Sequence, residues 1–197
     1  MPYTRDHKEQ SRERILQSAV RLFTRKGFDN TSIDEVMADA GLTRGAFYAH
    51  FKSKQDLYAQ AIASTPVFSI FGKTKPDGVD EKTWLAQLIN GYLSQLHVQK
   101  ADTPCPLAFL VTDVAVSEPA TRQAYTDVYL KMNRLIQAYT KKFSNCDKES
   151  VMAVTAMMIG GVAVARTLSD RKSQGQLLKS CRQVALSLLG ADNQQGL

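Results

Sequence analysis

Four side chains between residues 44 and 54 carry the chemistry that this sequence indicates most directly. They are Arg44, Tyr48, His50 and Lys54, and the stretch from 42 to 55 contains no acidic residue. An arginine can donate paired hydrogen bonds to guanine or to a phosphate. Tyrosine, histidine and lysine can donate to phosphate oxygens. The pattern therefore indicates a polyanion-binding surface, with base reading and phosphate clamping both open as roles for Arg44.

Two short helices joined by a tight turn are predicted to position these groups. Ser32 and Glu35 fit the S-x-x-E capping box at the start of the first helix. Gly41 is expected to end that helix, and Thr43 to cap the second. In the second helix Phe47 should be buried, so that Arg44, Gly45, Tyr48 and His50 face outward. A helical hairpin with a merely polar outer face is the alternative interpretation.

The flanking residues separate these two interpretations. Residues 27–57 read G-F-x-x-T-S-I-x-x-V-x-x-x-A-G-L-T-R-G-A-F-Y-x-H-F-x-S-K-x-x-L. This segment resembles the DNA-binding signature of the TetR family of bacterial transcriptional repressors. The resemblance implies that Tyr48 and His50 contact the DNA backbone and that Lys54 binds phosphate. The expected DNA contacts are Thr31, Ser32, Thr43, Arg44, Gly45, Tyr48, His50 and Lys54.

Composition sets wider bounds on function. The 197 residues are 44% hydrophobic and carry a net charge of +6, which predicts a folded protein and permits a polyanionic partner. The three cysteines form no metal-binding or redox pair, and the charged start has no signal region, so we expect a cytoplasmic protein. The apolar run from 151 to 165 is expected to be too short to span a bilayer. Enzymatic glycine-loop, zinc and nucleophile motifs are missing from the sequence, so we expect no enzyme, metal or cofactor.

Apolar residues at helical spacing predict an all-α protein throughout. A three-helix DNA-binding domain is expected over 1–52, and a larger helical domain over 53–197, linked by a helix that starts near 53. Within the larger domain one amphipathic stripe runs from Trp84 to Leu96, and a nearly apolar, central helix is expected from Leu107 to Val116. Longer helices are predicted over 119–142, 148–168 and 174–189.

The larger domain is expected to bind a small-molecule inducer, and the last two helices to form a homodimer. Leu177, Cys181, Val184 and Leu188 make a seam typical of helix bundles. Coverage of the domain's own core is the alternative, and the family resemblance favours the dimer. The expected lining of the inducer pocket is Trp84, Leu88, Tyr92, Cys105, Phe109, Asp113, Tyr125, Tyr129 and Met132. Each of these is also an ordinary core candidate.

Together with these features, the resemblance to the TetR family implies a homodimeric repressor that binds a palindromic operator in double-stranded DNA and is released by its inducer. The alternative is a repressor that senses oxidants or electrophiles through Cys105, which lies at an expected helix start where a thiolate is stabilised. The sequence leaves open the inducer, the operator, activation in place of repression, and whether one or two dimers bind each site.

Overall fold

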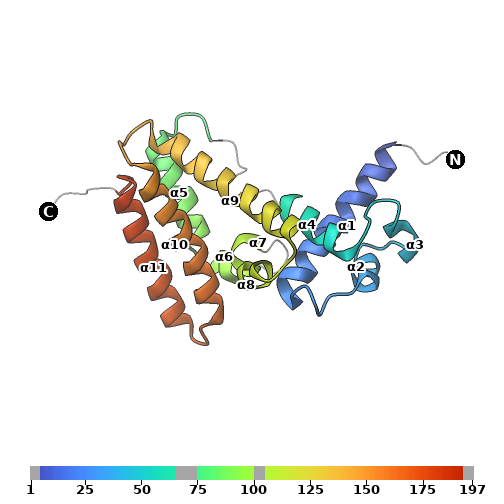
Figure 1. Cartoon of the computed structure of the whole chain (residues 1–197). Helices are drawn as coiled ribbons and strands as arrows, with labels where there is room; N and C mark the ends of the chain where they lie inside the picture. Colours follow the sequence, from blue (N-terminus) through green and yellow to red (C-terminus); the bar gives the residue numbers. More distant parts are fainter. Residues whose placement is uncertain (1–4, 65–74, 100–104, 193–197) are drawn as a thin grey trace. The chain divides into compact units, whose positions relative to one another are not determined.

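Two glycines and a proline lie at the ends of helices in the N-terminal and middle parts of the chain. In the computed structural model, Gly27 and Gly41 adopt positive φ values of 81° and 64°, directly after α1 (Arg5–Lys26) and near the end of α2 (Ile33–Asp39). Pro119 opens the long helix α9 (Pro119–Thr140). The structure describes residues 5–64, 75–99 and 105–192, and every regular element in these ranges is helical (Figure 1). The predicted all-α class is confirmed.

The first compact unit contains the predicted DNA-binding helices and a segment from much later in the chain. Ile15, Ala19 and Phe23 of α1 are fully or almost fully buried and lie four residues apart, so one face of this helix builds the core. Helix α1 packs against α2 and α4 (Lys54–Ser64). It also contacts α7 (Pro106–Phe109), which is followed by α8 (Val111–Ala115). Residues 105–128 therefore belong to this unit, beyond the predicted boundary at residue 52.

The second compact unit is a separate helical bundle. It contains α5 (Glu81–Tyr92), α6 (Gln95–Gln99), the later part of α9, α10 (Lys148–Thr167) and α11 (Arg171–Leu188). Helices α10 and α11 lie side by side, and both contact α5 and α6 (Figure 1). Asp147 and Asp170 cap α10 and α11 by accepting hydrogen bonds from Ser150 N and Ser173 N, each at 2.7 Å.

Two of the predicted helices are broken, and the breaks change which residues are buried. Helix α5 stops at Tyr92 because Leu93 leaves helical geometry with ψ 52°. Leu96, predicted on the same stripe as Trp84, is consequently 82% exposed on α6. The segment from Leu107 to Val116 splits into α7 and α8, and Val116 is 89% exposed. The prediction of one central apolar helix there was wrong.

Helix α10 reaches 20 residues with a mean hydropathy of 1.5, so by length and composition alone it could cross a membrane. The apolar run from 151 to 165, which was predicted to be too short to span a bilayer, lies within this longer helix. Its residues Val151, Val154, Met158 and Val162 are nevertheless buried inside the second unit. The expected buried helix is confirmed, since the core helix of a helical domain is apolar for the same reason as a membrane span.

Candidate nucleic-acid interface

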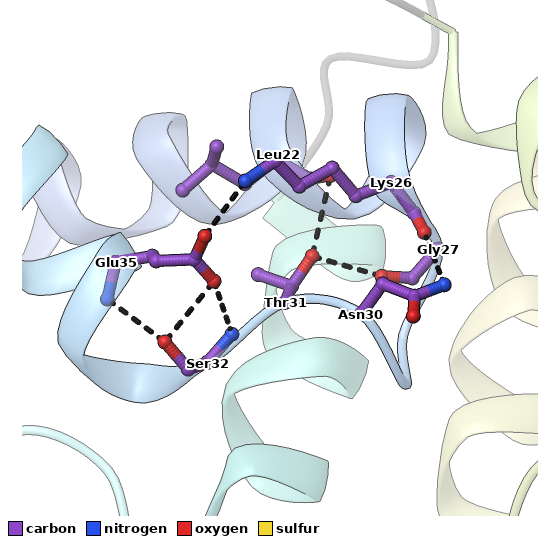
Figure 2. A network of polar contacts seen from close by, with 7 residues as sticks. All are labelled: Leu22, Lys26, Gly27, Asn30, Thr31, Ser32 and Glu35. Carbon is purple, nitrogen blue, oxygen red and sulfur yellow. Dashed lines mark hydrogen bonds and ion pairs between the residues drawn. The ribbon is translucent and has the colours of Figure 1, made fainter.

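The start of α2 is fixed by reciprocal hydrogen bonds. The Glu35 amide donates to Ser32 Oγ at 3.1 Å, and the Ser32 amide donates to Glu35 Oε2 at 2.8 Å, which confirms the predicted capping box (Figure 2). Lys26 at the end of α1 adds an ion pair to Glu35 Oε1 at 2.7 Å. The hydrogen bond from Lys26, followed by those from Ser32, lowers the pKa of Glu35 to about 2. Residues 26 to 35 thus join α1 rigidly to α2.

Thr31 belongs to the interior of this joint. Its hydroxyl donates to the Gly27 carbonyl at 2.8 Å, and its side chain is buried with 1% exposure (Figure 2). The neighbouring Asn30 side chain donates to the Lys26 carbonyl at 3.2 Å. Because the Thr31 hydroxyl is used inside the protein, we remove Thr31 from the proposed DNA contacts. Ser32 remains exposed beside it.

The turn between α2 and α3 (Arg44–Phe47) is held from both sides. The Leu42 amide donates to the Met37 carbonyl at 2.9 Å across Gly41, as in helix ends that use a left-handed glycine. Arg14 of α1 donates to the Ala40 carbonyl at 2.6 Å. Thr43 occupies the predicted N-cap position of α3, but its side chain makes no capping hydrogen bond. Its exposed hydroxyl remains available to a ligand.

Helix α3 is anchored by two aromatic residues. Phe47 and Phe51 are buried with exposures of 0% and 2%, and their ring centroids are 5.7 Å apart. Tyr48 stands edge-on to Phe47 at 5.2 Å and is 64% exposed. Arg44 and Gly45 are also exposed. Although α3 has a single turn, its apolar side is therefore fixed to the core while Arg44, Gly45 and Tyr48 project outward.

Arg44 is engaged by an acid from the preceding helix. Its guanidinium lies 2.5 Å from Asp34 Oδ2, and the two side chains are 60% and 57% exposed. An exposed pair of this kind contributes about 0–1 kcal/mol, so a phosphate or a guanine can displace Asp34 at low cost. The sequence analysis missed this partner, although Asp34 precedes Arg44 by only ten residues.

His50 differs from its prediction. Both of its ring nitrogens are buried and have no hydrogen-bond partner among the described residues, so the expectation that the imidazole faces outward was wrong. Burial, followed by the positive charges of Lys8 and Arg12, lowers the pKa of His50. Because these nitrogens are not accessible to a phosphate, we remove His50 from the proposed DNA contacts.

Lys54 begins α4, whose start is capped as predicted. The Asp56 amide donates to Ser53 Oγ at 3.1 Å, and the Lys52 amide donates to Asp56 Oδ2 at 2.9 Å. The Lys54 ammonium lies 4.2 Å from the centre of the Phe28 ring. This cation–π contact holds the ammonium near the N-terminus of α4. The free backbone amides at a helix N-terminus also attract anions, so the two together favour a phosphate.

The residues predicted to line an inducer pocket are divided between the two units. Trp84, Leu88, Tyr92, Tyr129 and Met132 lie in the second unit, where the Trp84 indole N–H is buried without a hydrogen-bond partner among the described residues. Cys105, Phe109, Asp113 and Tyr125 lie in the first. There the Tyr125 hydroxyl donates to the Leu107 carbonyl at 2.7 Å.

Asp113 has a role that the sequence did not predict. Its Oδ2 accepts a hydrogen bond from the Phe28 amide at 2.9 Å, across 85 positions of the chain. A Cβ atom on Gly27 would lie 3.0 Å from the same oxygen, so the backbone passes very close to this carboxylate. Asp113 thus holds the turn that leads from α1 into α2.

Comparison with known proteins agrees with this arrangement. Residues 15–61 match the family described as "Bacterial regulatory proteins, tetR family". The HTH-type transcriptional regulator LmrA of Bacillus subtilis (strain 168) is 25% identical over 169 residues, which cover 81% of this chain and 88% of LmrA. A shorter match, 31% identical over 51 residues, covers 26% of this chain and 27% of IcaR, the biofilm operon icaADBC HTH-type negative transcriptional regulator of Staphylococcus aureus (strain Newman).

Other relatives match a smaller part of the chain. Two of them align over 52 and 57 residues, and the chain spans only 18% and 26% of their own length. The fold is similar over nearly the whole chain, because the reduced form of Escherichia coli NemR superposes with a TM-score of 0.69 at 15% identity, covering 88% of this chain and 95% of NemR. The matched segment therefore identifies residues 15–61 as a helix-turn-helix domain of the TetR family of bacterial regulatory proteins, and the fold of the chain is similar to that of NemR.

Proposed function

We propose that the chain is a homodimeric transcriptional repressor and not an enzyme, and that it reads a palindromic operator through α3. The observation that carries this proposal is the pair of exposed side chains Arg44 and Tyr48 on a helix anchored by buried Phe47 and Phe51. A short helix pinned to a small core suits insertion into the major groove. Repression is favoured by the similarity to IcaR, which is a negative regulator.

Different side chains take different parts in this contact. Arg44 exchanges Asp34 for a guanine or a phosphate, and Gly45 lets the backbone of α3 approach the groove. Tyr48, Lys54, Ser32 and Thr43 position the protein on the phosphates, as most protein–DNA hydrogen bonds do. His50 is left out of this set, because both of its ring nitrogens are buried.

A dimer through α10 and α11 is supported by the exposure of the predicted seam. Val184 and Leu188 on α11 are 48% and 44% exposed, whereas their neighbours Leu178 and Ala185 are buried. Met152 and Val164 on α10 are 41% and 49% exposed. A Cβ on Gly160 would meet no atom within 4 Å, so this part of α10 is open to close approach by another helix. Apolar area of this kind on the two neighbouring helices favours a second copy of the same pair.

An inducer is proposed to bind inside the second unit near Trp84. The buried indole N–H there lacks a partner among the described residues, which is costly unless a ligand or water accepts from it. Leu88, Tyr92 and Met132 are buried in the same unit and supply an apolar lining. To release DNA, the ligand must bind more tightly to the dimer conformation that does not fit the operator.

The sensing alternative through Cys105 has less support than the sequence indicated. Cys105 precedes α7, but α7 has four residues and therefore only a small dipole to stabilise a thiolate. Burial raises the pKa of Cys146 and of Cys181, which disfavours their reactive thiolate forms. We therefore favour a ligand-responsive repressor that acts in the cytoplasm, where its DNA lies.

The test is binding of the purified protein to DNA from upstream of its own gene, against scrambled DNA, over a salt series. We expect preferential binding to the upstream DNA, and a steep loss of affinity with salt from phosphate contacts. Lys54→Ala should weaken binding at low salt. Lys131 is an exposed lysine on α9, and Lys131→Ala should leave binding unchanged. Equal affinity for both DNAs would mean that the protein binds DNA only non-specifically, through its positive charge.

The proposed dimer has its own test in sedimentation velocity. Val184→Glu places a charge in the exposed seam and should shift the protein toward monomer. Leu130→Glu is the matched control, because Leu130 on α9 is 42% exposed and lies outside α10 and α11. An unchanged oligomeric state in the Val184 variant would contradict the proposed interface.

A further inference from the structure

The first unit contains a cavity that the proposed functions do not use. It has a volume of about 310 Å³, within the range of small-molecule sites. Its walls come from the end of α1, the turn after it, α4, and the segment from α8 into α9. All of these segments belong to the same compact unit as the helix-turn-helix, so the site is separate from the inducer site proposed near Trp84.

The charged groups on the wall favour a cation. Asp29, Asp113 and Glu118 line the cavity, against a single basic residue, Lys26. Lys26 is already paired with Glu35 at 2.7 Å. Asp113 uses Oδ2 to accept from the Phe28 amide, and a carboxylate has acceptor capacity left on its other oxygen. The wall therefore offers more negative than positive charge to an occupant.

The aromatic part of the wall contains a buried polar group without a partner. Tyr58 is 1% exposed, and its hydroxyl has no hydrogen-bond partner in the described part of the chain. Burial, followed by the charge of Asp113, raises the pKa of Tyr58, so this hydroxyl stays protonated. The Phe28 ring lies 4.9 Å from the Tyr58 ring and lines the same cavity. A hydroxyl, two rings and a carboxylate together suit an ammonium attached to an apolar body.

We propose that this cavity binds a small protonated amine with an apolar or aromatic body, held by Asp113 and Tyr58, and that the bound amine lowers affinity for DNA. An ammonium bound to the other oxygen of Asp113 draws the carboxylate toward the cavity and away from the Phe28 amide. An occupied site therefore weakens the hold of Asp113 on the turn between α1 and α2, which positions the reading helix. The effect on DNA rests on the proposed function, whereas the binding of the amine does not.

The first experiment measures binding of 2-phenylethylamine to the full chain by titration calorimetry, with 2-phenylethanol as an uncharged probe of the same shape. We expect the amine to bind at least tenfold more tightly than the alcohol. Asp113→Asn keeps an oxygen that can accept from Phe28 but loses the charge, and it should weaken amine binding about tenfold or more. Tyr58→Phe should weaken it several-fold. Asp127→Asn, at an exposed site on α9, is the matched control and should bind as the wild type does.

The second experiment measures affinity for the upstream DNA with and without 2-phenylethylamine. The wild type should lose affinity, and Asp113→Asn should respond less than the wild type, each relative to its own affinity without amine. Thermal unfolding of each variant establishes that it is folded. Equal binding of amine and alcohol, or equal amine binding by Asp113→Asn, would overturn the site. Amine binding with unchanged DNA affinity would overturn its effect on DNA. A protein that binds the amine but no specific DNA would contradict the proposed function and leave the site standing.

Discussion

The carboxylate of Asp113 accepts a hydrogen bond at 2.9 Å from the backbone amide of Phe28, although the two residues are 85 positions apart. Phe28 follows the glycine that ends α1, and Asp113 lies on α8. A single long-range contact thus fixes the point at which the chain turns toward the helix-turn-helix.

Removing this carboxylate should destabilise the first unit. Asp113→Ala leaves the partly buried Phe28 amide without its acceptor, and we expect a loss of about 1–3 kcal/mol in the free energy of unfolding. Urea unfolding measures this loss. Asp127→Ala removes a carboxylate from the exposed surface of α9 and serves as the control. Equal losses in the two variants would mean that the contact with Phe28 adds nothing to stability.

Arg44 and Tyr48 should differ in what they contribute to DNA binding. If Arg44 reads a base, Arg44→Ala relaxes the preference at one base pair, whereas Tyr48→Ala weakens binding on all sequences. Fluorescence anisotropy with single-base variants of the operator distinguishes the two. A uniform loss on every variant would make Arg44 a phosphate contact.

Asp34 should oppose DNA binding, because it pairs with Arg44 in the free protein. Asp34→Asn removes this competitor and one negative charge near the phosphates. We expect DNA affinity to rise a few-fold, since an exposed pair contributes about 0–1 kcal/mol. The same anisotropy titration measures it at fixed salt, and Asp127→Asn is the control. Weaker binding would mean that Asp34 positions Arg44 for DNA.

The two glycines of the helix-turn-helix should respond oppositely to alanine. Gly41 has φ 64°, so Gly41→Ala is expected to cost about 1–2 kcal/mol in stability. Gly45 lies within α3 and the nearest atom to an added Cβ is 4.0 Å away, so Gly45→Ala should be neutral or slightly stabilising. Thermal unfolding tests both. If α3 approaches the groove closely, Gly45→Ala will weaken DNA binding without loss of stability.

Acid should destabilise the joint between α1 and α2 through Glu35. Its pKa is about 2 in the folded protein and ordinarily 4.5, so its contribution to stability is present above pH 4.5 and is lost as the pH falls toward 2. Glu35→Gln should therefore flatten the pH dependence of the urea midpoint between pH 4.5 and 2. Glu149→Gln, at an exposed position on α10, is the control, and an unchanged slope in Glu35→Gln would contradict the assignment.

Local signals in the sequence predicted the helix boundaries well, because each depends on a few adjacent residues. Ser32 with Glu35, Gly41 and Pro119 all mark helix ends where they were expected. The stripe from Trp84 to Leu96 failed because one non-helical residue, Leu93, changes the phase of everything after it. Periodicity assumes an unbroken helix and cannot detect such a break.

The sequence predicted the site residues whose exposure follows from their neighbours in the chain. It did not predict those whose position depends on residues far away in the sequence. Tyr48 and Arg44 follow from the burial of Phe47, three residues or fewer away. The burial of Thr31 depends on its contacts with α1 and the turn after it, and no residue next to His50 in the sequence indicates that its ring nitrogens are buried. Asp113 is the clearest case, because nothing near it in the sequence indicates a contact with Phe28.

The contact between Asp113 and Phe28 also bears on how such proteins can exchange parts. A graft that transfers only the first 64 residues onto a relative brings Phe28 against a foreign α8, and the amide loses its carboxylate unless that helix happens to supply one. Functional hybrids should therefore require that residues 105–128 are transferred together with residues 1–64. The recombination unit of this fold is discontinuous in the chain, and shuffling at a single crossover point separates residues that act together.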